Sequence, residues 1–134
     1  MKTKQFLFFL FVGILVLTGC KKEESSNSQK IQGKWTIVST VSSGKVSGIA
    51  YSIPLTADAS DYIEFLSNGT YNEVLGSMSV TGTYTATDTQ VIMTSDGTSI
   101  VNTIVSQTDT SLVLKYQITI DANNYQGETI TLKK

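Results

Sequence analysis

Two patterns of hydrophobic positions divide the chain. Residues 6–17 form an unbroken apolar run, preceded by Lys2 and Lys4 and followed by the small residues Thr18 and Gly19. From about residue 33 onward, apolar and polar residues instead alternate with a period of two between turn-forming residues. The first pattern is typical of a secretory signal, and the second predicts a domain made almost entirely of β-strands.

Eight stretches of the second pattern are predicted to be strands. They cover residues 33–42, 62–66, 71–75, 79–85, 90–94, 98–106, 112–120 and 125–133. Gly44 and its polar neighbours are expected to end the first strand. Residues 43–60 are open to two interpretations, a further strand or an extended lid, because their apolar residues alternate like a strand whereas Pro54 lacks the donor that a ladder needs.

Consecutive short hairpins pair neighbouring strands in order, and a meander of eight strands avoids exposed edges by closing on itself. The predicted fold is therefore an all-β, eight-stranded antiparallel up-and-down barrel over residues 31–134. A two-sheet β-sandwich stays open as the alternative, although it needs longer crossings between its sheets. The 17 threonines after position 20 and the six tyrosines suit the half-buried faces of either arrangement.

The first hydrophobic run and the residues after it predict how the chain is exported. The run is too short to span a bilayer, which takes about 20 helical residues, so residues 1–19 are interpreted as a cleaved signal peptide. Leu17-Thr18-Gly19-Cys20 resembles the lipobox of bacterial lipoproteins. The resemblance implies cleavage before Cys20 and attachment of acyl chains such as palmitate to this cysteine. We therefore expect a lipid-anchored protein of the cell envelope, located at the outer membrane.

Residues 20–30 are polar after the cysteine and are predicted to form a flexible tether. The run Lys21-Lys22-Glu23-Glu24 is similar to the short export signals of some Gram-negative lipoproteins that are displayed on the cell surface. A soluble leash with no sorting role is the alternative. Because Cys20 is the only cysteine, its acylation leaves no thiol for a disulfide or a metal.

Composition excludes several classes of function. Removal of the signal leaves 115 residues, enough for one domain, with eight lysines, no arginine and eleven acidic residues. The resulting charge of −3, without a basic patch, disfavours nucleic-acid binding. The absence of histidine removes the commonest general base and metal ligand. The carboxylate pairs Asp58 with Asp61 and Glu64 with Glu73 are assigned to loops or outward-facing strand positions. We expect no catalytic, metal-binding or cofactor-binding residue, and no enzyme.

A family resemblance rests on several short motifs. Gly33-Lys34-Trp35 resembles the Gly-x-Trp signature at the start of the lipocalin barrel. Four later motifs resemble those of small bacterial lipocalin-like lipoproteins. They are Ile63-Glu64-Phe65, Asn68-Gly69-Thr70-Tyr71, Gly82-Thr83-Tyr84 and Leu112-Val113-Leu114. The resemblance implies a barrel of lipocalin type. It does not imply a particular ligand, since this chain has no arginine to stack on Trp35 and no disulfide.

An eight-stranded barrel is either filled by side chains or holds one small ligand. The positions predicted to face inward are Trp35, Ile37, Ile63, Phe65, Tyr84, Met93, Leu114, Tyr116 and Ile118. Of these, Phe65, Tyr84, Met93 and Tyr116 are the candidates to line a pocket. The two tyrosines are the strongest, because an inward hydroxyl needs a polar partner that a ligand can supply.

Two functions fit these expectations. The leading hypothesis is a monomeric, membrane-tethered barrel that binds a small, largely apolar ligand. The alternative is a structural or interaction protein of the cell surface, without a small-molecule ligand, whose exposed strands and residues 43–60 dock another envelope component.

Overall fold

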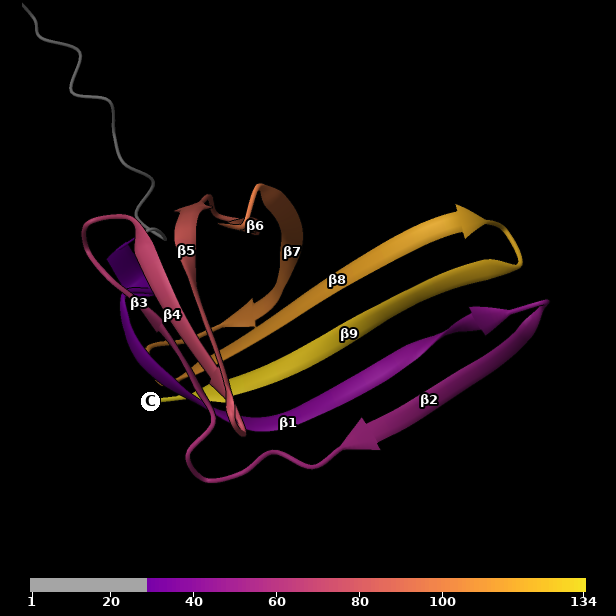
Figure 1. Cartoon of the computed structure of the whole chain (residues 1–134), viewed down its shortest axis with the longest axis horizontal. Helices are drawn as coiled ribbons and strands as arrows, with labels where there is room; N and C mark the ends of the chain where they lie inside the picture. Colours follow the sequence, from indigo (N-terminus) through magenta and orange to yellow (C-terminus); the bar gives the residue numbers. More distant parts are fainter. Residues whose placement is uncertain (1–28) are drawn as a thin grey trace, which may run out of the picture.

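The described part of the chain is residues 29–134 of a computed structural model. It forms a single antiparallel sheet in the order β2-β1-β3-β4-β5-β6-β7-β8-β9 (Figure 1). The strands are β1 (Gly33–Val46), β2 (Ile49–Leu55), β3 (Tyr62–Phe65), β4 (Thr70–Leu75), β5 (Met78–Ala86), β6 (Gln90–Ser95), β7 (Thr98–Gln107), β8 (Ser111–Asp121) and β9 (Asn124–Lys133). The eight predicted strands are all present, with ends that differ by a few residues.

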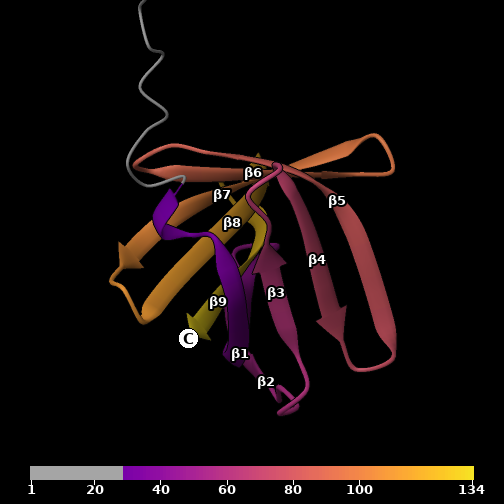
Figure 2. The same ribbon diagram turned by 90° about the vertical axis from the view of Figure 1, so that its left-hand side faces the viewer.

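β1 closes the sheet into a barrel because it bonds to strands on both of its edges (Figure 2). Residues 33–36 pair with β3, and residues 36–45 pair with β9. A register shift between Ile37 and Ser39 lets the strand bend between these two roles. The predicted eight-stranded antiparallel barrel is thus confirmed, and the sandwich alternative is wrong.

The undecided segment 43–60 contains a ninth strand rather than a lid. Residues 49–55 of β2 pair with residues 40–46 of β1, with Pro54 opposite Val41. The prediction that β1 ends at Gly44 was wrong. It runs on to Val46 and turns at Ser47 and Gly48, whose φ angles are 50° and 83°.

Gly44 stands within the strand because there is no room for a side chain. A Cβ atom there would lie 2.3 Å from the Tyr125 carbonyl oxygen and 2.8 Å from the Tyr51 hydroxyl oxygen. The glycine therefore marks a close approach of the backbone to its neighbours, which sequence reasoning misread as a strand end.

Beyond the barrel, β2 and the far halves of β1, β9 and β8 continue as a four-stranded extension, residues 40–55 and 116–130 (Figure 1). The tips of its two hairpins are joined by hydrogen bonds. The Gly48 N–H donates to the Asn123 carbonyl oxygen at 3.0 Å, and the Ser47 N–H donates to Asn124 Oδ1 at 2.9 Å. The extension is therefore one connected sheet.

The apolar core fills the end of the barrel where β1 begins and β9 ends. Its fully buried side chains include Ile31, Trp35, Ile63, Phe65, Leu112 and Leu132. Trp35 Nε1 donates to the Ile31 carbonyl oxygen at 2.6 Å. Although the chain has no arginine, a cation does lie over Trp35: the Lys134 ammonium is 4.4 Å from the ring centroid. It also donates to the Gln32 carbonyl oxygen at 2.7 Å, which closes this end.

Ile118 does not belong to this core, contrary to the prediction. The cross-strand register keeps it on the inner face, yet it is 54% exposed. The reason is that β8 pairs with β7 only as far as Lys115, so that Ile118 lies in the extension, where no opposite wall covers it.

Candidate ligand-binding cavity

The barrel is not filled along its whole length. A cavity of about 200 Å³ lies inside it, toward the extension. Its apolar wall is formed by Ile63, Tyr71, Met93, Ile100, Leu114 and Ile130. Polar side chains from four strands also reach it: Glu73 from β4, Asn102 from β7, Tyr116 from β8 and Glu128 from β9. An apolar wall with a few converging polar groups is typical of a small-molecule site.

Cross-strand pairing explains why these polar residues face inward. Residues directly opposite each other on antiparallel strands point to the same side of the sheet. Glu73 is opposite the buried Ile63, and Asn102 is opposite the buried Val91. Tyr116 and Glu128 are opposite each other, two residues beyond the inward pair Leu114 and Ile130.

The Glu73 carboxylate lies in an environment that disfavours its charge. Burial raises the pKa of Glu73, and the nearby Glu128 carboxylate raises it further. The Tyr116 hydroxyl donates to Glu128 Oε2 at 3.3 Å. Burial, followed by the charge of Glu128, raises the pKa of Tyr116, so this hydroxyl remains a donor at neutral pH.

No lysine lines this cavity among the described residues, so its carboxylates have no positive partner there. Asn102 adds a further polar group and is only 4% exposed. Its side chain borders the cavity. An amide offers both donors and an acceptor, so a bound molecule can form hydrogen bonds with it.

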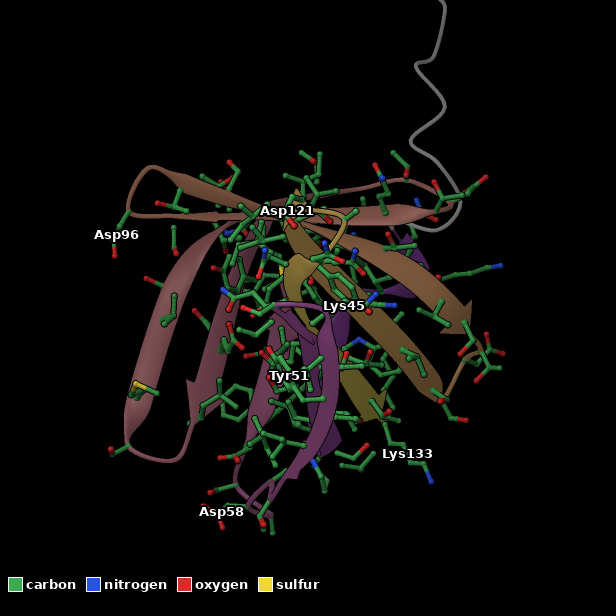
Figure 3. The ribbon with its side chains drawn as sticks, turned by 90° about the vertical axis from the view of Figure 1, so that its right-hand side faces the viewer. Lys45, Tyr51, Asp58, Asp96, Asp121 and Lys133 are labelled. Carbon is green, nitrogen blue, oxygen red and sulfur yellow. The ribbon has the colours of Figure 1, made fainter. Side chains whose placement is uncertain are left out.

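Exposed apolar side chains continue the inner face beyond the cavity. Leu75 and Ile100 lie at its rim, and Val80 lies opposite Glu73 on β5. Each is between 37% and 45% exposed, and the register places all three on the inner face. On the extension the same face carries Ile53 and Leu55, at 52% and 46%. Figure 3 views the molecule from the tip of the extension, and Tyr51 lies near the centre of this view. The opposite face of the extension bears mainly polar residues such as Ser43, Lys45, Ser52, Gln117 and Thr129.

The four predicted pocket residues divide into two groups. Met93 and Tyr116 line the cavity. Phe65 and Tyr84 do not: their rings pack edge to face with centroids 4.9 Å apart, and the Tyr84 hydroxyl donates to the Leu66 carbonyl oxygen at 2.9 Å. Tyr84 thus finds its polar partner in the backbone. Of the signature residues, Trp35 is buried in the closed end, and Gly33 adopts a φ of 109° where β1 begins.

The assignment of Glu73 to an outward position was wrong. Glu64 is opposite Asn72 on the outer face, whereas Glu73 faces the cavity, so these two carboxylates do not pair. Asp61 does not pair with Asp58 either. Its carboxylate accepts the backbone N–H groups of Asp58 and Gly76, each at 2.8 Å, and the bond from Gly76 is the larger cause of its lowered pKa. Asp61 therefore stabilises the turn that begins at Asp58 and links it to the turn at Gly76.

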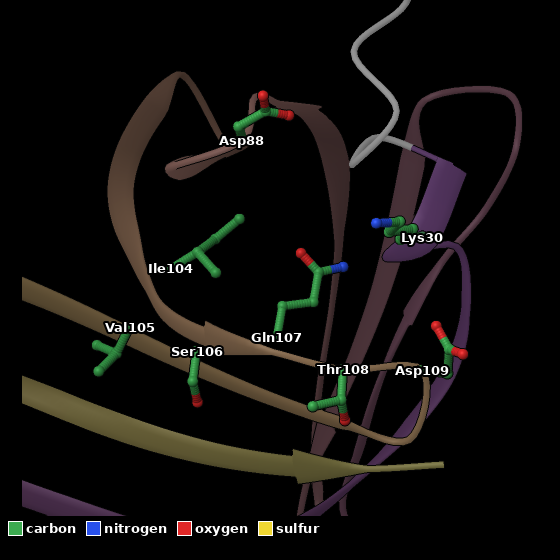
Figure 4. Close-up of a pocket in the computed structure, with 8 residues that line it drawn as sticks. All are labelled: Lys30, Asp88, Ile104, Val105, Ser106, Gln107, Thr108 and Asp109. Atoms are coloured by element: carbon green, nitrogen blue, oxygen red, sulfur yellow. The ribbon is translucent and has the colours of Figure 1, made fainter.

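A second hollow, of about 420 Å³, lies at the closed end (Figure 4). Its lining comes from Lys30, the end of β7 and two turns, and it is mainly polar. Both amide atoms of Gln107 are buried there without a hydrogen-bond partner among the described residues. This hollow offers less apolar wall than the inner cavity, which remains the better site for an apolar ligand.

The barrel, open toward one end and lined by apolar residues, defines a protein of lipocalin type. The model of the lipocalin-like domain family matches residues 31–114, and the chain belongs to this family. No curated protein matches the chain. The described residues contain no cluster of three or more metal-ligating side chains. In that same part of the chain, no helix has the length and apolar character to cross a membrane. Cys20, the lipobox and most of the predicted tether lie outside the described residues.

Sequence reasoning missed Glu73, Asn102 and Glu128 as cavity residues. Glu73 and Glu128 were detectable in principle, because each lies an even number of residues from a buried neighbour in its own strand, Tyr71 and Leu132. Because both residues are charged, no inward position was predicted for them, although the alternation of their strands places them on the inner face.

Proposed function

We propose that this protein binds a small ligand with a largely apolar body in its barrel, and that it does so as a lipid-anchored protein of the cell envelope. The observation that carries the first part is the cavity, whose apolar wall continues into the exposed apolar face of the extension. The proposal assigns the chain no catalytic role and treats it as a monomer.

Ligand binding is tested with the chain from residue 21 on, which retains the complete barrel and its closed core and so should fold by itself. Nile red, a neutral fluorescent probe, is titrated into the wild type and into Ile100→Trp, which places a bulky ring at the cavity rim. Val101→Trp is the matched control, since Val101 is 47% exposed against 45% for Ile100 but faces outward. We expect at least a tenfold loss of affinity for Ile100→Trp alone. Equal affinity of the two variants would refute binding in the cavity.

The anchoring part of the proposal rests on Leu17-Thr18-Gly19-Cys20 and the charged residues after it. The first strand of the barrel begins at the closed end of the domain, where the Lys134 ammonium donates to the Gln32 carbonyl oxygen. A tether that starts there would leave the cavity open toward the side away from the membrane. Cells are labelled with an alkyne analogue of palmitate. Wild type should incorporate the label and fractionate with membranes, and Cys20→Ala should do neither. Labelling of the alanine variant would contradict the proposal.

The alternative, docking of another envelope protein, is favoured by one observation, the exposed apolar residues of β2. Crosslinking on intact cells tests it, with Ile53→Ser and Leu55→Ser combined in one variant. A crosslinked partner that is lost in this variant while Nile red binding persists would favour docking over ligand binding.

A further inference from the structure

We propose that the ligand of this cavity carries a primary ammonium group, bound by Glu73, Glu128 and the Asn102 amide, on an apolar body that lies along the four-stranded extension. The inference rests on the proposed function and specifies the chemical class of the ligand.

The charge of the cavity is the first step. Two carboxylates face a largely apolar space whose lining holds no lysine. Burying an uncompensated carboxylate is unfavourable, and the raised pKa of Glu73 reflects this cost. A cation placed between the two groups removes the repulsion and replaces it with attraction. An anionic ligand, such as a fatty acid, would add a third negative group to the same space.

The number of acceptors is the second step. A primary ammonium has three N–H donors and no acceptor. Each carboxylate retains an oxygen for it, even though Glu128 Oε2 already accepts the Tyr116 hydroxyl. The third acceptor is the amide oxygen of Asn102, a residue that is only 4% exposed and lines the cavity. The three side chains come from three different strands, so the site depends on the closed barrel.

The size of the cavity is the third step. Pockets for small molecules measure about 300–1,000 Å³, whereas this one measures about 200 Å³. It accommodates a head group and part of a chain. The remainder of the ligand has an apolar surface available, because Ile53, Leu55 and Ile118 continue the inner face and are about half exposed.

Four probes with the same alkyl chain test the inference: octylamine, octanol, octanoate and octyltrimethylammonium. Each is titrated by calorimetry at pH 7.5, below its micelle-forming concentration, into the chain from residue 21 on. We expect octylamine to bind at least tenfold more tightly than octanol, since hydrogen bonds to charged groups are roughly twice as strong as neutral ones. Octanoate should bind most weakly. Octyltrimethylammonium has the charge without the N–H donors and should lose most of the preference.

Glu73→Gln and Glu128→Gln should each reduce the ratio of octylamine to octanol affinity at least threefold. Glu64→Gln is the matched control, because Glu64 lies on the neighbouring strand and faces outward. Equal or tighter binding of octanol or octanoate to the wild type would overturn the inference and leave the proposed function standing. A ratio unaffected by both cavity variants would also overturn it. If none of the four probes binds although Nile red does, the inference is overturned and the proposed function stands; if Nile red does not bind either, the proposed function itself fails.

Discussion

Substitution of Trp35 by phenylalanine should destabilise the domain far more than a conservative aromatic exchange usually does. Trp35 is fully buried, and its Nε1 donates to the carbonyl oxygen of Ile31, a residue that is also fully buried. Phenylalanine keeps a six-membered ring but loses this donor, the volume of the five-membered ring and part of the attraction to the Lys134 ammonium.

The magnitude follows from these three losses. An unpaired buried carbonyl costs about 1–3 kcal/mol. The missing ring atoms cost about 1–2 kcal/mol as lost burial and a residual void, and the weaker cation–π contact costs about 0.5 kcal/mol. The sum, roughly 2.5–5.5 kcal/mol, is a large part of the 5–15 kcal/mol by which a native domain is typically stable. The melting temperature should fall by more than about 10 °C.

Urea denaturation followed by far-UV circular dichroism provides the measurement. Tryptophan fluorescence does not serve, because Trp35 is the only tryptophan and disappears in the variant. Thr36→Ala is the control: Thr36 is the exposed, outward-facing neighbour of Trp35, and its loss should cost less than about 0.5 kcal/mol. If the free energy of unfolding of the phenylalanine variant falls by less than about 1 kcal/mol, the closed end does not depend on this hydrogen bond.

Three further substitutions test other parts of the fold. Lys134→Met removes the cation over Trp35 and should lower the free energy of unfolding by about 0.5–1 kcal/mol, whereas Lys134→Arg should retain it; equal melting temperatures of both variants would contradict this. Gly82→Ala places a Cβ 2.1 Å from the Thr94 carbonyl oxygen, and the forced shift should cost about 1–3 kcal/mol in urea denaturation, with the exposed Thr83→Ala as control. Glu73→Gln should stabilise the domain at pH 8 but not at pH 4. The folded state raises the pKa of Glu73 above its ordinary value of 4.5, so the wild type loses stability as the pH rises past that value, whereas glutamine does not titrate. A difference in urea midpoint that is the same at pH 4, 6 and 8 would exclude this explanation.

The barrel was predictable because period-two alternation and turn residues both act locally. Strands such as β6 and β8 carry their buried residues at every second position, and Asp96 and Gly97 adopt the positive φ angles that the turn signal implies. The extension was not predictable in the same way. Alternation looks identical whether a face is covered or open, so Ile118 appeared as a core residue although the opposite wall ends before it.

The candidate site was predictable only in part, for a related reason. Met93 and Tyr116 follow from the rule that apolar and aromatic residues face inward. Glu73 and Glu128 violate that rule, and only the pairing of each with an inward neighbour reveals their direction. Which tyrosine meets the cavity depends on contacts between distant strands. The Tyr84 hydroxyl donates to the backbone carbonyl of Leu66, 18 residues away, whereas the Tyr116 hydroxyl donates to the cavity residue Glu128.

The hydrogen bonds that join Ser47 and Gly48 to Asn123 and Asn124 have a mechanical consequence. They couple two hairpins separated by more than 70 residues of sequence, so that neither is able to swing independently. A molecule bound on the inner face of the four-stranded extension would therefore contact one rigid sheet and not two independently moving hairpins. The amide hydrogen exchange rates of Ser47 and Gly48 should accordingly rise or fall together. Their common change measures any hinge motion between the extension and the barrel.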